Sequence, residues 1–346
     1  MNEIIKKDCI EIYKEYYINL KKLSGKKILI TGGSGFLLSY LTYLLIYYNQ
    51  QNKKKIDIHV IDQNIKKFTN FKNDKNLKLT NADISKKIKF KTKYDYIIHG
   101  ASIASPVYYK KKPLETINSN VNGLVNILEN YKSSKKPKSI VFMSSSEIYG
   151  DPDKKNIPTK ETYNGNVSCT GPRACYDESK RLGETISKIF HDKYNTPIKI
   201  VRPFNVYGPG QNLNDKRIFP DLMNSIKRNK DIILFSDGTP TRSFCYISDQ
   251  IRGILEVLFK GKNGESYNIG NTQEISIKNL AKLAIKISKK KLRVIMKSNL
   301  DKTFNVDCPK RRCPDIKKIY NLSKWKPKIK LETGLSKTIN YYRMQK

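Results

Sequence analysis

Short apolar segments alternate with longer helical segments through most of the chain. Six segments are rich in β-branched or aromatic residues and have the length of buried strands. They span residues 27–31, 56–62, 77–80, 94–99, 139–143 and 198–201. Between them, apolar residues recur at helical spacing in residues 36–48, 114–131 and 173–191. This alternation predicts βαβ units, and therefore an α/β fold with a doubly wound parallel sheet that carries helices on both faces.

The two ends of the chain follow different patterns. In residues 1–25, isoleucine and tyrosine recur loosely at helical spacing, which predicts an N-terminal helical extension that covers a domain or subunit surface. Beyond residue 203, proline, glycine and basic loops mix with short helical patterns. We therefore expect a larger domain at residues 26–205 and a smaller, interleaved substrate-binding lobe at residues 206–346.

The first predicted strand leads directly into a glycine-rich turn and then a helix. The turn reads Thr31-Gly32-Gly33-Ser34-Gly35-Phe36-Leu37. Gly32 and Gly35 permit a tight turn and a close backbone approach to a pyrophosphate. The free N–H groups at the start of the helix, around Phe36 and Leu37, attract its negative charge. A strand, a glycine turn and a helix in this order predict a Rossmann-type dinucleotide site.

Two aspartates bear on which dinucleotide binds. Asp62 ends the second strand, 27 residues after Gly35. An acidic residue there hydrogen-bonds a ribose 2′-hydroxyl and repels a 2′-phosphate, so it favours NAD over NADP. Asp83, after the third strand, is either an adenine-edge contact or an ordinary turn residue. The third glycine of the usual motif would fall at Leu38, so either the helix lies farther out or leucine fills a gap made elsewhere.

A tyrosine and a lysine provide candidate acid–base chemistry. Tyr176 and Lys180 are four residues apart in a helical stretch and share one face. A free tyrosine has a pKa of about 10, and lowering it by 3 units requires roughly 4 kcal/mol of differential stabilisation of the phenolate. An ammonium beside it and a positive nicotinamide ring are expected to supply this. The strand at 139–143 ends in serines, and Ser145 or Ser146 can hydrogen-bond the sugar oxygen that Tyr176 deprotonates.

These residues resemble the extended short-chain dehydrogenase/reductase family of NAD-dependent nucleotide-sugar epimerases, dehydratases and decarboxylases. The resemblance extends from about Lys26 to the C-terminus. Within the family it is most specific toward the enzymes that decarboxylate UDP-glucuronate to UDP-xylose. The segments that carry it are 101–109, 163–167, 171–181, 241–244 and 309–318, followed by Trp325 and Pro327.

The resemblance implies a reaction cycle on one bound NAD. Tyr176 accepts the proton of the sugar 4-hydroxyl while a hydride leaves C4, which places a ketone β to the C6 carboxylate and allows CO₂ to leave. Glu147 matches the family's catalytic glutamate, and Arg312 matches the arginine that faces the carboxylate region. Ala101 lies in a matching cofactor segment. The expected substrate contacts are Tyr109, Asn205, Arg217, Arg242 and Arg312, together with Arg202 in a segment that resembles the diphosphate-binding one.

Other activities of the same family remain open. The 4,6-dehydratases carry an Asp-Glu pair where this chain has Ser146-Glu147, and the 4-epimerases usually lack the glutamate. Both differences favour decarboxylation. Gly210 and Asn164 depart from the decarboxylase pattern, so a 4-epimerase, a 4,6-dehydratase or a 4-keto reductase for surface polysaccharide synthesis is an alternative. A non-catalytic binding protein on this scaffold is a remote one, because it would not need Ser145, Tyr176 and Lys180.

Charge and cysteine content limit the partners. The net charge is +36, from 67 Lys and Arg against 31 Asp and Glu. The basic residues are spread along the chain without a nucleic-acid motif, so we expect an anionic small substrate and no specific nucleic acid. No apolar run approaches the roughly 20 residues of a membrane span. Six cysteines show no pairing pattern, and Cys308 and Cys313 lack further ligands, which favours free thiols, a cytoplasmic protein and no metal. The family resemblance implies a homodimer built on the helices at 114–131 and 173–191.

Overall fold

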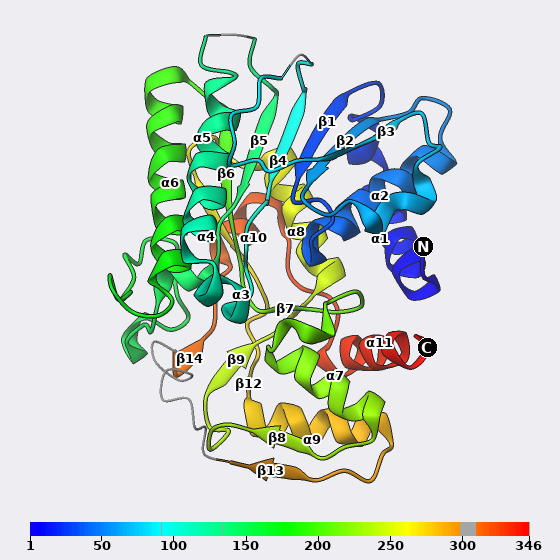
Figure 1. Cartoon of the computed structure of the whole chain (residues 1–346), viewed down its shortest axis with the longest axis vertical. Coiled ribbons are helices and arrows are strands. Elements are labelled where there is room, and N and C mark those ends of the chain that lie inside the picture. Colours follow the sequence, from blue (N-terminus) through cyan, green and yellow to red (C-terminus); the bar gives the residue numbers. More distant parts are fainter. Residues whose placement is uncertain (91, 134, 298–308, 346) are drawn as a thin grey trace.

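The structure is a computed structural model that describes residues 1–90, 92–133, 135–297 and 309–345 (Figure 1). Within these residues, seven parallel strands form the central sheet in the order β11-β6-β5-β4-β1-β2-β3. Their bounds are β1 Lys27–Thr31, β2 Asp57–Asp62, β3 Leu77–Asn81, β4 Tyr96–His99, β5 Ser139–Met143, β6 Ile198–Pro203 and β11 Ser266–Ile269. The predicted doubly wound α/β fold is confirmed. The strand order reverses direction at β1 and β4, which places the ligand crevice at their carboxyl ends.

Helices cover both faces of this sheet. Buried side chains of α1 (Glu3–Lys21), α2 (Phe36–Gln51) and α8 (Ile247–Lys260) belong to the core cluster on one face. Those of α5 (Asn122–Glu129) and α6 (Ala174–Tyr194) belong to the cluster on the other face, with α4 (Pro113–Asn120) beside α6. Figure 1 shows α4, α5 and α6 together at one side of the sheet and α1 and α2 at the other.

Two elements differ from the sequence-based expectation. The helix predicted at 114–131 is interrupted at Val121, and the resulting α5 brings Gly123 close to Ile84, which follows β3, and to His99 of β4. The seventh strand, β11, was not anticipated. It has only four residues, and its pairing with β6 joins segments more than sixty residues apart. Such a strand is defined by the edge that it pairs with rather than by its own pattern.

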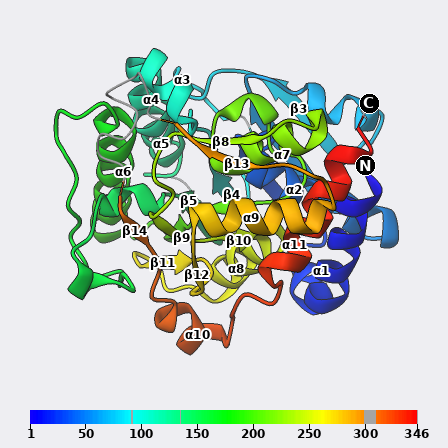
Figure 2. The ribbon, with the colours of Figure 1, turned by 90° about the horizontal axis from the view of Figure 1, so that it is seen from below.

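Most of the remaining elements form the second lobe, below the carboxyl ends of the strands (Figure 1). Its helices are α7 (Ile218–Arg228), α9 (Ile277–Ser288) and α11 (Leu331–Arg343), whereas α3 (Pro106–Lys111) packs on α4 and α6, and α10 (Lys317–Ser323) packs on α8 and β11. Its short strands are β7 Val206–Tyr207, β8 Ile232–Leu234, β9 Thr241–Ser243, β10 Cys245–Tyr246, β12 Glu274–Ser276, β13 Val294–Met296 and β14 Arg311–Arg312. Figure 2 shows α9 beside both α7 and α11, which packs the lobe against the C-terminal helix.

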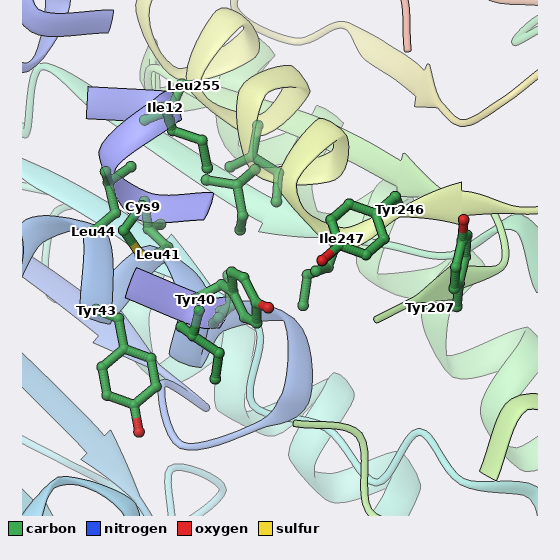
Figure 3. Packing of buried hydrophobic residues seen from close by; sticks show 14 of the residues in the cluster. Cys9, Ile12, Tyr40, Leu41, Tyr43, Leu44, Tyr207, Tyr246, Ile247 and Leu255 are labelled. Atoms are coloured by element: carbon green, nitrogen blue, oxygen red, sulfur yellow. The ribbon is translucent and has the colours of Figure 1, made fainter. Parts of the chain in front are cut away.

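The N-terminal helix α1 is part of the main core. Its apolar face, including Ile5, Cys9 and Ile12, is buried against α2 and α8. Figure 3 shows Cys9 and Ile12 facing Leu41, Leu44 and Leu255 of these two helices. Burial of this face stabilises the helix, since most helical stability in proteins comes from tertiary packing of an amphipathic face. Among the described residues, no helix combines the length and hydrophobicity needed to cross a membrane.

Candidate active site

The glycine turn lies at the carboxyl end of β1 and opens into a cleft of about 830 Å³. Gly32 has a φ of 72°, and a Cβ atom there would lie 2.6 Å from the backbone nitrogen of Ala101. Only glycine fits this backbone, and Ala101 forms the opposite wall of the cleft. Gly35 is the N-cap of α2, so the free N–H groups of Phe36 and Leu37 point to the same place.

Asp62 and Asp83 line this cleft from the ends of β2 and β3. Asp62 accepts hydrogen bonds from the backbone nitrogens of Ser34, at 3.0 Å, and Asn64, at 3.1 Å. It therefore braces the glycine turn and faces the cleft at the position expected for a ribose contact. Asp83 accepts two hydrogen bonds from Ser85. Its carboxylate is thus engaged in its own turn while it lines the cleft.

Leu38, at the position of the missing third glycine, is buried between α2 and the turn after β4. Its side chain packs against Gly100, which follows β4, and a Cβ atom at Gly100 would lie 2.4 Å from Leu38 Cδ1. The same Cβ atom would lie 3.2 Å from Met143. Of the two possibilities left open by the sequence, leucine filling a gap made elsewhere is the one observed. The gap is the missing side chain of Gly100.

The residues around the cleft fit a dinucleotide. Two buried hydroxyls that line it, Ser34 Oγ and Ser102 Oγ, have no hydrogen-bond partner among the described residues. Buried polar atoms are normally paired, so two such hydroxyls beside a helix N-terminus indicate polar ligand atoms. The glycine turn, Asp62 and these hydroxyls together match the pyrophosphate and ribose of NAD.

Tyr176 and Lys180 project from α6 into a second cleft of about 740 Å³ that continues from the first. Lys180 Nζ donates to the carbonyl of Met143 at 2.8 Å and lies 5.8 Å from the centre of the Tyr176 ring. Ser145 and Ser146, at the end of β5, line the same cleft. The structure therefore brings the predicted tyrosine, lysine and serines together at the carboxyl end of β5.

Burial dominates the protonation of this pair. It raises the pKa of Tyr176 to about 12, although hydrogen bonding with Ser145 acts in the opposite direction. Burial also lowers the pKa of Lys180 to about 7, despite the favourable charge of Glu184. The protein groups alone thus do not make Tyr176 a base at neutral pH. The positive charge of an oxidised nicotinamide beside the phenol is what would lower its pKa.

Glu147 is held between arginines. Arg312 donates to both carboxylate oxygens, and Arg173 donates to one of them from the other side. Burial would raise the pKa of Glu147, but these two guanidiniums outweigh it and lower the pKa to about 2. Arg242 adds to the effect because it is the register partner of Arg312 in adjacent strands β9 and β14. Glu147 is therefore a permanent anion at neutral pH.

Three expected substrate residues line the second cleft, namely Tyr109, Asn205 and Arg217. Tyr109 stacks on Tyr176 with ring centres 5.3 Å apart, and its hydroxyl has no hydrogen-bond partner among the described residues. Asn205 donates to the Ser243 carbonyl at 3.1 Å, and Arg217 pairs with Asp215. A buried phenol with an open hydroxyl beside Tyr176 is a suitable contact for a sugar.

Three of the expected arginines do not line either cleft. Both terminal nitrogens of Arg312 donate to the carboxylate of Glu147. Arg242 donates to the backbone carbonyl of Thr241 at 2.8 Å. Arg202 is not at the diphosphate site, because it is buried in a paired contact with Glu184 and a 2.6 Å hydrogen bond to Tyr149. Direct contact with a bound sugar therefore falls to the arginines that do line the cleft.

Arg173 is a cleft residue that the sequence reasoning did not single out. It precedes α6, three residues before Tyr176, inside the segment that carried the family resemblance. Its ion pair with Glu147 depends on the tertiary approach of the turn after β5, whereas its 3.8 Å pair with Asp177 is local, four residues along α6. The only sequence feature that pointed to Arg173 was its position three residues before Tyr176.

No metal centre or disulfide competes with this site within the described residues. They hold no group of three or more His, Cys, Asp or Glu side chains placed to bind a metal. Cys9, Cys169, Cys175, Cys245 and Cys313 are free thiols, and Cys308 is outside the described residues.

Comparison with known proteins supports the same interpretation. The model of the NAD dependent epimerase/dehydratase family matches residues 28–270. UDP-glucuronic acid decarboxylase 6 of Arabidopsis thaliana is 35% identical over 319 residues, which cover 90% of this chain and 87% of that protein. Among solved structures, UDP-glucose 4-epimerase of Thermotoga maritima with UDP-glucose superposes with a TM-score of 0.80 at 25% identity, covering 92% of this chain and 98% of that one. UDP-glucuronic acid 4-epimerase of Bacillus cereus, in complex with UDP-glucuronic acid and NAD, gives 0.75 at 26% identity, with 91% and 98% covered.

Proposed function

Because this chain belongs to the NAD dependent epimerase/dehydratase family, we propose that it decarboxylates UDP-glucuronate to UDP-xylose. The observation that carries the proposal is the state of Glu147. A 4,6-dehydratase needs a carboxylic acid beside the sugar to protonate the departing hydroxyl, and here the position before Glu147 is Ser146. Glu147 itself is held ionised by Arg173 and Arg312. Loss of CO₂ needs no such acid.

NAD, held by the glycine turn of Gly32 and Gly35 and by Asp62, would supply reversible hydride transfer at C4 of the sugar. Tyr176 accepts the proton of the 4-hydroxyl and gives it back in the last step. Ser145 and Ser146 hydrogen-bond the oxygen at C4. Lys180, which is close to its own pKa at neutral pH, stabilises the phenolate in its protonated form.

The carbon–carbon step follows from the ketone at C4. The C5–C6 bond breaks, CO₂ leaves, and the bonding electrons move onto C5 and the C4 carbonyl as an enolate. A proton from solvent then adds to C5. Return of the hydride to C4 from the reduced cofactor would restore the alcohol, so the cycle would consume no net oxidant. The residues of the cleft orient this step, because C4 must stay at Tyr176 while C6 faces the arginine-rich corner.

The corner around Glu147 is suited to an anionic substrate. Arg173, Arg242 and Arg312 surround two carboxylates, those of Glu147 and Asp177, which leaves it net positive. Arg217, in the wall of the same cleft, is a candidate contact for the diphosphate, which a planar guanidinium binds through paired hydrogen bonds. We infer that the glucuronate carboxylate enters near Arg173.

We also infer that the chain is a homodimer. Leu182 and Ile189 of α6 and Leu114 of α4 are between 46% and 71% exposed, on two helices that lie side by side. Two such faces in contact would form a four-helix interface. An apolar face of this kind is typical of an interaction surface.

Mass spectrometry of UDP-glucuronate incubated with the purified protein and NAD tests the proposed reaction. The expected product is lighter by one CO₂ and co-elutes with UDP-xylose. Glu147→Gln should abolish its formation, whereas Glu178→Gln, the same change at an exposed ion pair on α6, should leave it intact. An unchanged mass with a new retention time would instead establish a 4-epimerase, and loss of one water a dehydratase.

A further inference from the structure

We propose that Asp8, on the N-terminal helix α1, is a positioning residue that holds the substrate lobe against the NAD-binding domain and sets the shape of the nucleotide-sugar cleft. This inference rests on the proposed function for the identity of the ligand, but its structural basis is independent of the reaction. It assigns a role to a helix that the sequence predicted only to cover a domain or subunit surface.

Asp8 is fully buried and connects three separate elements. Its Oδ2 accepts hydrogen bonds from Tyr246 Oη of β10 at 2.7 Å and from Tyr40 Oη of α2 at 3.4 Å. Its Oδ1 pairs with Lys337 Nζ of α11 at 2.8 Å. A buried carboxylate is costly unless it is paired and hydrogen-bonded, and here all its partners lie on other elements. The helix α2 that follows the glycine turn and two elements of the substrate lobe, β10 and α11, thus meet at one side chain.

The rest of the polar face of α1 attaches to the same lobe and its neighbours. Glu15 pairs with Arg252 of α8 at 2.9 Å and with Lys328, shortly before α11, at 2.5 Å. Tyr16 Oη donates to Glu256 of α8 at 2.8 Å. These contacts fix α1 along its length, so a change at Asp8 alters one joint without releasing the helix.

The loop after β7 provides the first structural connection between the contacts of Asp8 and the cleft. A Cβ atom at Gly210 would lie 3.9 Å from both Ile5 Cδ1 of α1 and Tyr341 Oη of α11. The next residue, Gln211, lines the cleft, and its carbonyl accepts a hydrogen bond from Tyr342 of α11. The wall of the cleft at 210–212 therefore rests on the two terminal helices that Asp8 and Lys337 join.

The second connection is a row of aromatic rings. Tyr246, which donates to Asp8, meets Tyr207 at a ring distance of 5.6 Å, and Figure 3 shows the two side by side. Tyr207 stacks on Phe219 at 4.2 Å, and Phe219 lines the cleft. Closely packed rings transmit a shift at one end because protein interiors have little free volume.

The test compares Asp8→Asn with Glu11→Gln as a matched control. Glu11 is on the same helix and also reaches Lys337, at 3.6 Å, but it is about half exposed. Two quantities are measured well below the unfolding temperature: the dissociation constants of UDP and of NAD, and amide hydrogen exchange in residues 206–217. We expect Asp8→Asn to weaken UDP binding by roughly 3- to 30-fold, with NAD affinity changed less than about twofold and faster exchange in 206–217. Glu11→Gln should change neither quantity.

Several outcomes would overturn the positioning role. Unchanged exchange in 206–217, equal weakening of UDP and NAD binding, or the same effects in Glu11→Gln would each do so. If Asp8→Asn does not fold, Tyr246→Phe keeps the Asp8–Lys337 pair and should show a smaller effect in the same direction. If the native chain does not bind UDP, the proposed substrate is wrong, while hydrogen exchange still decides the role of Asp8.

Discussion

The fit of Leu38 against Gly100 makes a sharp prediction about the cofactor site. Gly100→Ala places a methyl group 2.4 Å from Leu38 Cδ1 and 3.2 Å from Met143, both closer than atoms normally approach. Either Leu38 or the start of α2 must move. Overpacking of this kind costs about 1–3 kcal/mol, which corresponds to a lower unfolding midpoint by roughly 1–4 °C in a chain of this size. Because Gly100 lines both clefts, NAD affinity should fall as well.

A double-mutant cycle separates this clash from any other effect of alanine. Leu38→Ala removes the atoms that the new methyl group would strike, and by itself costs about 2–5 kcal/mol for the lost buried contacts. In that background Gly100→Ala should be neutral or stabilising, with a coupling energy of roughly 1–3 kcal/mol. Thermal unfolding of the four proteins, with and without NAD, measures this coupling. If Gly100→Ala costs the same in both backgrounds, the two residues do not compensate each other and the reasoning fails.

Three further predictions concern the catalytic pair and the exposed helices. Tyr176→Phe should lower turnover by at least about 100-fold while calorimetry shows native-like binding of NAD and UDP; retained turnover would remove the proposed base. The pKa of Lys180 is lowered in the native protein, so between about pH 7 and 10 Lys180 is protonated in the unfolded chain and neutral in the native one. Lys180 therefore makes the free energy of unfolding rise with pH, by up to about 1.4 kcal/mol per pH unit. Denaturant unfolding of cofactor-free protein at pH 7, 8 and 9 should show a shallower rise for Lys180→Met, and identical slopes would contradict the assigned pKa. Leu182→Glu should convert a dimer to a monomer in light scattering, whereas a native protein that is already monomeric would exclude the interface.

The pattern of short apolar runs predicted the central strands because a buried parallel strand must be apolar on both faces. The glycine turn could also be predicted from the sequence, because its strand, tight turn and helix occupy consecutive residues. β11 and the helix break at Val121 could not be predicted from the sequence. A four-residue strand acquires its identity from the edge of β6, and the break depends on how α5 meets the sheet.

The catalytic site also contains one part that the sequence predicts and one part that only the tertiary structure shows. Tyr176 and Lys180 are four residues apart on one helix, so their proximity is local and follows from helical geometry. The clamp on Glu147 joins the turn after β5, the start of α6 and β14, and Glu147 and Arg312 are 165 positions apart in the chain. Sequence similarity placed Arg312 near the carboxylate region, but only the packing of β14 on β9 shows that its guanidinium is engaged by Glu147 and not by the cleft.

The sequence by itself determined the fold class, the cofactor turn and the Tyr-Lys pair, because these depend on residue periodicity and on neighbours a few positions apart. The tertiary structure alone decided the protonation of that pair, the partners of Glu147, the compensation of Leu38 by Gly100 and the placement of α1. Each of these depends on burial or on contact between distant segments. The free energy of a charge or a methyl group is set by the atoms around it, and those atoms are brought there by the whole fold.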